Sequence, residues 1–275
     1  MERKVLTVQD ISCYGQCSLT VALPIISACG IETAILPSAV LSTHTGGFSG
    51  FTFRDLSSDL DGIVDHWQKT DISFDCIYTG YLGSLSQINF VKTLPERVGK
   101  KDCLFVVDPA MADNGVLYTG FNLEYAKAMA SLCAKGDVIL PNVTEACFIT
   151  GTEYRNTQDK SFCIELMDKM SAMGAKNIVL TGAYRDEETI TVAVRCGSED
   201  KFYTHELMPK GSHGTGDIYA SAFVGALMNG KSVYDSAVIA ADFTLKCIKE
   251  TAKYKDHWYG AKFEPVLKVL PELLK

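Results

Sequence analysis

The sequence lacks the features that place a chain in a membrane or along a nucleic acid. It contains no run of about 18 apolar residues, so we expect no membrane span. Lysine and arginine number 26 against 33 aspartates and glutamates, which gives a formal charge of −7. Binding along a phosphate backbone needs clustered basic side chains, so we expect no nucleic-acid partner. A local pocket for one phosphate group stays compatible with this charge.

Export signals and disulfide motifs are also missing. Residues Met1–Lys4 lead into a short apolar stretch that Gln9 and Asp10 interrupt, which is not the pattern of a signal peptide. The ten cysteines are scattered, and no two of them form a Cys-x-x-Cys pair. Most lie in apolar segments, where cysteine behaves as a small core residue. We therefore expect a reduced, cytoplasmic protein.

What the sequence does have is an alternation of strand and helix patterns over 275 residues, 47% of them apolar. No repeat, linker or low-complexity tract divides the chain, so we expect one domain over residues 1–275. The four apolar residues Leu104–Val107 are typical of a strand buried on both faces of a parallel sheet. Further strands are expected over residues 5–8, 32–36, 76–79, 138–140 and 177–180, and helices over 18–29, 59–68, 85–94, 124–134, 145–149 and 161–173.

The alternation of strands and helices changes in the last third of the chain. Two strand-like runs, Thr189–Val194 and Lys201–Leu207, flank Gly197-Ser198-Glu199-Asp200, which predicts an antiparallel hairpin. Helices are expected after it, over residues 217–228, 233–250 and 264–274. Together these patterns predict an α/β fold in three layers, α/β/α, around a mostly parallel sheet.

Several predicted strands end in polar or glycine residues. Ligands of parallel α/β sheets bind outside the carboxyl ends of the strands, so we interpret these residues as the rim of one pocket. The alternative is that each is only the polar exit that any strand needs. The rim residues are Asp10, Gly80-Tyr81, Asp108, Asn142 and Thr181-Gly182.

Two glycine motifs are candidates for a phosphate site. Gly225-x-x-x-x-Gly230-Lys231-Ser232 formally matches the P-loop pattern. A working P-loop follows a buried strand and opens a helix, whereas Gly225 falls within a helical pattern and Gly230 stands where a C-cap belongs. We therefore interpret this match as a coincidence.

The second motif, Gly211-Ser212-His213-Gly214-Thr215-Gly216-Asp217, lies directly before a long predicted helix. The first N–H groups of a helix lack internal partners and carry partial positive charge, and glycines let an anion approach them. Such a loop suits the charge on a transferred phosphoryl group. The Asp217 carboxylate can take the proton from an attacking hydroxyl. Alternatively, it only stabilises its own helix start, which is worth about 0.3–1 kcal/mol.

Other short motifs accompany this loop in chain order. They are Leu6-Thr7-Val8-Gln9 with Tyr14-Gly15, Ser42-Thr43-His44-Thr45-Gly46, Thr79-Gly80-Tyr81-Leu82-Gly83, Val107-Asp108-Pro109 with Asp113, and Pro141-Asn142 with Glu145. Together with Gly214-Thr215-Gly216-Asp217 they resemble the pyridoxal kinases, a family of the ribokinase superfamily. The resemblance implies a ribokinase-like fold without a separate lid domain, a homodimer, and ATP-dependent phosphorylation of the 5′-hydroxymethyl group of a vitamin B6 compound.

The resemblance also implies roles by position. Asp217 would be the general base, and the backbone of Gly214, Thr215 and Gly216 the anion hole. Mg²⁺ would be held partly through water, and the family often uses K⁺ near the phosphates. The remaining implied contacts are Asp108, Asp113 and Glu145 for Mg²⁺, Asn142, Glu145, Thr181 and Gly182 for the triphosphate, and Thr45 and Tyr81, with His44 in the substrate loop, for the pyridine ring.

Two positions depart from the family pattern. Asp10-Ile11 follows Gln9, where pyridoxal kinases commonly carry Ser-His. We hypothesise that Asp10 pairs with a protonated ring nitrogen or an amine, which would favour pyridoxamine or hydroxymethylpyrimidine over pyridoxal. Ser212-His213 stand where apolar residues are usual, and His213 either contacts the ring or is exposed in its loop.

Two other functions stay open. Hydroxymethylpyrimidine phosphate kinases typically show a Gly-Gly-rich N-terminal loop and a cysteine in place of the catalytic aspartate. This chain has Tyr14-Gly15-Gln16 and Asp217 there, so hydroxymethylpyrimidine kinase is the second interpretation. The third is a protein that binds a vitamer or nucleotide without catalysis, against which Asp217 and the loop glycines argue.

Overall fold

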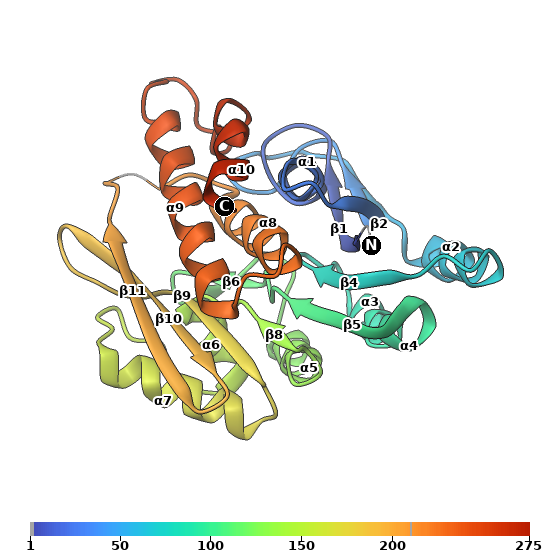
Figure 1. The fold of residues 1–275 in the computed structure, drawn as a ribbon, viewed down its shortest axis with the longest axis horizontal. Helices are drawn as coiled ribbons and strands as arrows, with labels where there is room; N and C mark the ends of the chain where they lie inside the picture. The colour runs from blue at the N-terminus through green and yellow to red at the C-terminus, as the bar shows by residue number, and fades with distance from the viewer. Residues whose placement is uncertain (1–2, 210) are drawn as a thin grey trace.

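The computed structural model describes residues 3–209 and 211–275. A sheet of nine strands forms its centre (Figure 1). The predicted domain over residues 1–275 includes Met1, Glu2 and Lys210, which lie outside the described residues, and its extent stays a prediction. The strands are β1 (Lys4–Ser12), β2 (Glu32–Leu41), β3 (Phe53–Asp55), β4 (Phe74–Thr79), β5 (Gly99–Val107), β8 (Val138–Ile139), β9 (Asn177–Arg185), β10 (Thr189–Cys196) and β11 (Glu199–Glu206), with β6 (Ala112–Asp113) and β7 (Val116–Leu117) as a separate pair.

The strands follow the order β11-β10-β9-β8-β5-β4-β1-β2-β3. The six from β9 to β2 are parallel to their neighbours, whereas β10 and β11 at one edge and β3 at the other are antiparallel. Residues Val5–Asp10 of β1 are all buried, as expected of a central strand covered on both faces. The expected mostly parallel sheet with a C-terminal antiparallel hairpin is confirmed.

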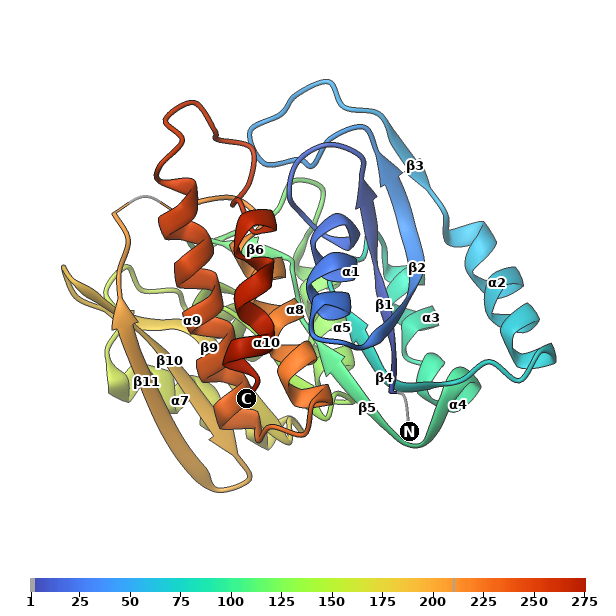
Figure 2. The ribbon, with the colours of Figure 1, turned by 45° about the horizontal axis from the view of Figure 1, so that its top comes forward.

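Helices cover both faces of the sheet and complete the three predicted layers (Figures 1 and 2). One core packs around Ile25, Phe223 and Phe243 beneath α1, α8, α9 and the C-terminal segment, and the other contains Leu60 and Phe162. None of the described helices combines the length and apolar character that crossing a bilayer requires. The helices are α1 (Leu19–Ala28), α2 (Ser57–Lys69), α3 (Leu85–Val91), α4 (Leu94–Val98), α5 (Leu123–Cys133), α6 (Val143–Thr150), α7 (Lys160–Ala172), α8 (Thr215–Met228), α9 (Val233–Thr251), the 3₁₀ helix η1 (Glu264–Val269) and α10 (Leu270–Leu273).

Two of the predicted helices differ from those in the structure. The predicted helix 85–94 ends earlier, because α3 stops at Val91, and a separate helix that was not predicted, α4, begins at Leu94 with Pro95 in its first turn. The predicted helix 264–274 is η1 followed by α10, with Pro265 and Pro271 in their first turns. Proline lacks an N–H group and fits best in the first turn of a helix, where these prolines stand, although Pro24 lies within α1. The strand β3 and the second half of β2 were not predicted.

Gly225 lies in the last turn of α8, next to Cys29 at the end of α1. A Cβ atom at Gly225 would lie 2.4 Å from Sγ of Cys29, so the helices require glycine at this contact. Gly230 follows the C-cap of α8 with φ +85°, and Ser232 caps α9 by accepting the N–H of Asp235 at 3.1 Å. The P-loop match is therefore a coincidence, as predicted.

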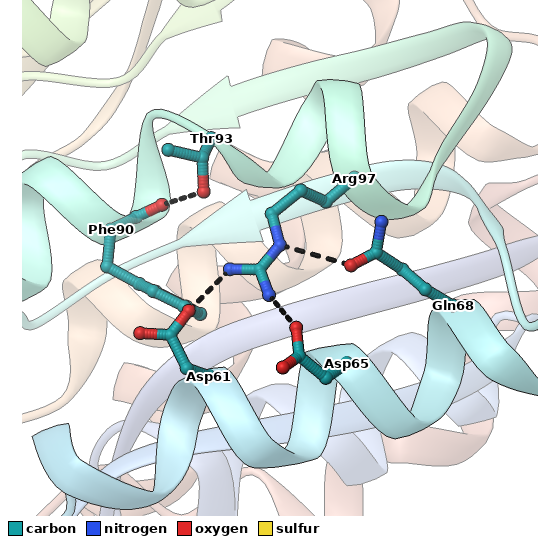
Figure 3. Close-up of polar contacts among 6 residues, drawn as sticks. All are labelled: Asp61, Asp65, Gln68, Phe90, Thr93 and Arg97. Carbon is teal, nitrogen blue, oxygen red and sulfur yellow. Dashed lines mark hydrogen bonds and ion pairs between the residues drawn. The ribbon is translucent and has the colours of Figure 1, made fainter.

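Arg97 of α4 contacts three side chains of α2 (Figure 3). Its Nη1 and Nη2 atoms lie 2.7 Å and 2.6 Å from carboxylate oxygens of Asp61 and Asp65, and its Nε donates to Gln68 at 3.3 Å. Exposed ion pairs of this kind are each worth about 0–1 kcal/mol. The cluster therefore fixes the position of α2 rather than contributing much stability.

Candidate active site

The predicted rim residues lie toward the carboxyl ends of the parallel strands, although three of them are inside strands. Gly80 and Asp108 directly follow β4 and β5, and their N–H groups donate to the carbonyls of neighbouring strands at 3.1 Å and 2.9 Å. Asn142 follows β8 and bridges to Thr181 of β9. Asp10 does not end β1, which continues to Ser12 after a register shift, and Thr181-Gly182 lie within β9. Strand lengths were underestimated because the apolar pattern stops before the hydrogen-bonded ladder does.

The glycine loop turns directly into α8, and its shape depends on Gly214. This residue has φ +76°, and a Cβ there would lie 1.8 Å from the backbone oxygen of Gln16. Gly214 is also the N-cap of α8 and has no side chain to bind the first N–H groups of the helix. No atom lies within 4 Å of the position of a Cβ on Gly216. Open space beside uncapped helical N–H groups suits an anion.

Asp217 lies in the first turn of α8 and is half-buried, so its carboxyl group is not walled inside the protein. Burial raises its pKa to about 7, the backbone N–H of Ser18 opposes that rise, and the charge of Asp10 adds to it. A carboxylate that titrates near neutrality can accept a proton under physiological conditions. The predicted base and the predicted substrate residue Asp10 thus belong to one site.

The substrate loop is fixed to the C-terminal segment through His44. Its Nε2 lies 2.8 Å from the carbonyl oxygen of Tyr259, and its Nδ1 accepts the N–H of Gly46 at 3.1 Å. Burial lowers the pKa of His44, and these two contacts are satisfied by a neutral ring protonated at Nε2. The His213 ring is exposed but lies 5.5 Å from that of His44. Thr45 is exposed in the same loop.

Tyr81 lies half-buried just after β4, the strand that pairs with β1, and β1 carries Asp10. Burial, with a contribution from Asp10, raises the pKa of its phenol to about 12. Its ring stacks on Phe121 with centroids 5.5 Å apart, and Phe121 stacks on Tyr125 in turn. The phenol is therefore a neutral hydrogen-bonding group held in place from behind.

The three predicted metal residues occupy different environments. Asp108 is buried and accepts the N–H of Ala110 at 3.1 Å, and burial, then the charges of Glu145 and Asp217, raise its pKa. Glu145 is buried with both oxygens occupied, because they accept backbone N–H groups of Met111 at 3.0 Å and Asn142 at 2.9 Å. Burial raises the pKa of Glu145 to about 7.

Glu145 also closes a capping box at the start of α6, in which the side chain of Asn142 accepts the Glu145 N–H at 2.9 Å. The Nδ2 of Asn142 donates to the carbonyl of Ala112, next to Asp113. Asp113 itself is exposed and binds Asn114. The capping box therefore fixes Glu145 at the start of α6, and its Asn142 links this helix start to β6, where Asp113 lies.

These carboxylates fit a Mg²⁺ ion that keeps its bound waters better than a metal ion that is held directly by side chains. In residues 3–209 and 211–275, no three His, Cys, Asp or Glu side chains are grouped closely enough to hold a metal directly. Yet Asp108 lies within the electrostatic influence of Glu145 and Asp217, and the ion pairs of the described chain give none of the three a lysine or arginine. Magnesium keeps several waters and binds through one or two carboxylates, which matches this arrangement.

Sequence patterns did not identify three residues that shape this site. Ser18 contacts both Asp10 and Asp217, Gln16 packs on Gly214, and the carbonyl of Tyr259 accepts bonds from Gln16 and His44. Ser18 stood at the start of the helix expected over residues 18–29, and nothing in the local pattern indicated contacts with two carboxylates. The contacts of Gln16 and Tyr259 join segments about 200 or more residues apart, and no local pattern could have revealed them.

Comparison with known proteins agrees with this geometry. The family model for phosphomethylpyrimidine kinase matches residues 57–262. The pyridoxal kinase of Dictyostelium discoideum is 27% identical over 82% of this chain and 78% of its own length. The hydroxymethylpyrimidine/phosphomethylpyrimidine kinase of Bacillus subtilis (strain 168) is 24% identical over 91% of this chain and 84% of its own.

A crystal structure from Bacteroides thetaiotaomicron VPI-5482, assigned as a phosphomethylpyrimidine kinase and containing pyridoxal, has the same fold. It superposes with a TM-score of 0.92 and 35% identity, and the match covers 98% of this chain and 96% of that one. The resemblance found in the sequence is confirmed. The chain is a ribokinase-like kinase that belongs to the phosphomethylpyrimidine kinase family.

Proposed function

We propose that this kinase transfers the γ-phosphoryl group of ATP to the 5′-hydroxymethyl group of a vitamin B6 vitamer, with Asp217 as general base. The observation that carries the proposal is a half-buried carboxyl group, with a pKa raised to about 7, one turn inside a helix that opens from a glycine loop. The pyridoxal kinase of Dictyostelium and the Bacteroides structure with pyridoxal support the choice of substrate.

In the proposed reaction the substrate hydroxyl lies against Asp217. Its oxygen forms a bond to the γ-phosphorus while its proton passes to the Asp217 carboxylate, and the bond from the γ-phosphorus to the bridging oxygen of ADP breaks. The N–H groups of Gly214, Thr215 and Gly216 stabilise the charge on the transferred oxygens. Phosphoryl transfer requires positioning and charge neutralisation more than covalent help from the protein, and this loop supplies both.

The acidic cluster would hold Mg²⁺, which neutralises phosphate charge when bound. Asp108 is the residue best suited to contact its hydration shell, because only one of its oxygens has a backbone partner. Glu145 and Asp113 would act through water. Asn142, Thr181, Gly182 and Glu145 would line the triphosphate, and K⁺ beside the phosphates belongs to the same proposal.

The pyridine ring would lie between the strand end that carries Asp10 and the substrate loop. His44 is neutral and fixed, Tyr81 offers a neutral phenol, and Thr45 and His213 are exposed beside them. A ring in this place would have polar groups on its edge and aromatic side chains nearby. Ordered polar groups around an apolar ring are the usual composition of a small-molecule site.

Hydroxymethylpyrimidine kinase is the second candidate function. The family model and the B. subtilis relative favour it, and a pyrimidine alcohol offers the same hydroxymethyl group. A protein that binds a vitamer without catalysis is the third. The carboxyl group of Asp217, with its pKa of about 7, lies beside the open start of the helix and argues against this third candidate, since binding alone needs no base.

A coupled assay of ADP release with a panel of vitamers and pyrimidines separates the three candidates. We expect turnover with at least one of pyridoxal, pyridoxine and pyridoxamine at a higher kcat/KM than with hydroxymethylpyrimidine. The reverse order would make the pyrimidine the substrate. No ADP release with any of them, combined with measurable vitamer binding, would leave the non-catalytic alternative.

We also propose a cytoplasmic homodimer. The ten cysteines are free thiols, and six of them are buried, which fits a reducing compartment. The dimer rests on the family resemblance alone. Sedimentation of the purified protein would test it.

A further inference from the structure

Ser18 has an unusual backbone conformation in the centre of the site. Its φ of 56° and ψ of −132° lie where residues other than glycine are rare, and the residue is buried. Backbone outliers of this kind persist only where the surroundings enforce them, and they gather at functional sites. Ser18 is therefore a position whose contacts need an explanation.

The contacts of Ser18 join the two carboxylates of the site. Serine at a helix start normally accepts an N–H bond from its own helix, yet Ser18, the N-cap of α1, makes no such bond. Its hydroxyl instead lowers the pKa of Asp10 and its backbone N–H lowers that of Asp217, so the two groups face these carboxylates. One residue thus fixes Asp10 relative to the proposed base.

Asp10 is a buried carboxylate without a positive partner. It is 4% exposed, and its Oδ2 accepts the hydroxyl of Ser12 at 2.8 Å. No lysine or arginine of the described chain forms an ion pair with it. The nearest ionisable ring, His44, has both nitrogens bound to backbone groups in its neutral form. A charge that is buried and supported only by hydroxyls is costly unless a cation joins it.

We propose that Asp10, held by Ser12 and Ser18, is a specificity-determining residue that selects alcohol substrates carrying a cationic amino group. The inference rests on the proposed function, because the substrate must present its hydroxyl to Asp217 and its amine to Asp10 at once. Ser18 lies beside both carboxylates, so one small substrate can reach both of them. An aminomethyl-substituted pyridine alcohol, such as pyridoxamine, has this chemistry.

The test compares pyridoxamine with pyridoxine, which has an uncharged hydroxyl in place of the amine. We expect the wild-type protein to have the higher kcat/KM for pyridoxamine. Asp10→Asn should reduce the ratio of the two kcat/KM values by about 10- to 100-fold, the range for a lost bond between charged groups. Asp75→Asn is the matched control, because Asp75 lies on the neighbouring strand at its opposite end and pairs with Lys100. The control should leave the ratio unchanged.

Two substitutions at Ser18 test its positioning role. Ser18→Ala and Ser18→Gly both remove the hydroxyl, but only glycine accepts the φ of 56° without strain. Both variants should lose roughly tenfold of the preference for pyridoxamine, as a lost hydrogen bond to a charged group predicts. Ser18→Gly should remain folded, so a lost preference in that variant is not a folding defect. A merely structural role would change thermal stability and leave the substrate ratio as it was.

Failure of this inference is distinguishable from failure of the proposed function. Turnover of both vitamers with an equal ratio in wild type and Asp10→Asn would overturn the role of Asp10 and leave the kinase reaction intact. If the wild type releases no ADP with either vitamer, calorimetric binding of pyridoxamine to wild type and Asp10→Asn still tests the cation site. Equal affinities would then overturn it, and a weaker Asp10→Asn would support it.

Discussion

Replacing Asp217 by asparagine is the sharpest test of the chemistry. The amide is nearly the same size as the carboxylate but cannot accept the proton of the attacking hydroxyl. We expect kcat to fall by about 10²- to 10⁴-fold, the usual contribution of a general base. ATP binding should change little, since the N–H groups of Gly214–Gly216 and the residues around Asn142 stay in place.

The same substitution should stabilise the protein in a pH-dependent way. The pKa of Asp217 is raised from 3.8 to about 7 in the folded protein, so its ionised form is disfavoured there. This destabilisation is absent at pH values below the pKa of Asp217 in the unfolded chain. It grows as pH rises from about 3.8 to about 7 and is complete above pH 7. It amounts to at most the order of 4 kcal/mol, and less for a half-buried side chain. Asp217→Asn should therefore melt higher than wild type at pH 8, by up to about 8 °C.

Two measurements check these expectations. The pH profile of kcat/KM should rise with pH and level off above about 7, because the base acts only when deprotonated and this profile reports the free enzyme. Melting curves at pH 4 and pH 8 should show the extra stability of Asp217→Asn at pH 8 alone. Wild-type turnover by Asp217→Asn, or a flat profile between pH 5 and pH 8, would refute the assignment of the base.

Three further outcomes follow from the same geometry. Gly214→Ala should unfold more easily by at least about 1–3 kcal/mol, because its positive φ and the oxygen of Gln16 reject a side chain, whereas Gly216→Ala should be no less stable than wild type in denaturant titrations. Lys231→Ala should keep kcat within about twofold, since no P-loop exists there and substitutions away from the core and the site are usually mild; a dead Lys231→Ala enzyme would reverse that conclusion. Removing Mg²⁺ with a chelator should abolish ADP release, and Asp108→Asn should raise the Mg²⁺ concentration needed by about 10–100-fold; an unchanged Mg²⁺ titration would remove Asp108 from the metal site.

The order of strands and helices was predictable because it depends on local periodicity. Leu104–Val107 indicated a strand buried on both faces, and the hairpin residues indicated the change to antiparallel pairing. The glycine loop before α8 was predictable for the same reason, because helix starts and glycine turns depend on residues that are adjacent in the sequence. Pro95 and Pro271 favour a helix start, and each stands in the first turn of a helix, but the sequence analysis did not use them to place these starts.

By itself the sequence determined the α/β class, the glycine loop that opens α8, and, through resemblance, the kinase family. Only the tertiary structure decided which side chains meet. Ser18 contacts Asp10 and Asp217, and Tyr259 contacts Gln16 and His44, because the sheet order and the C-terminal segment bring distant parts of the chain together. Helix starts and strand periodicity depend on neighbouring residues, whereas the charge that surrounds a buried carboxylate depends on everything packed against it.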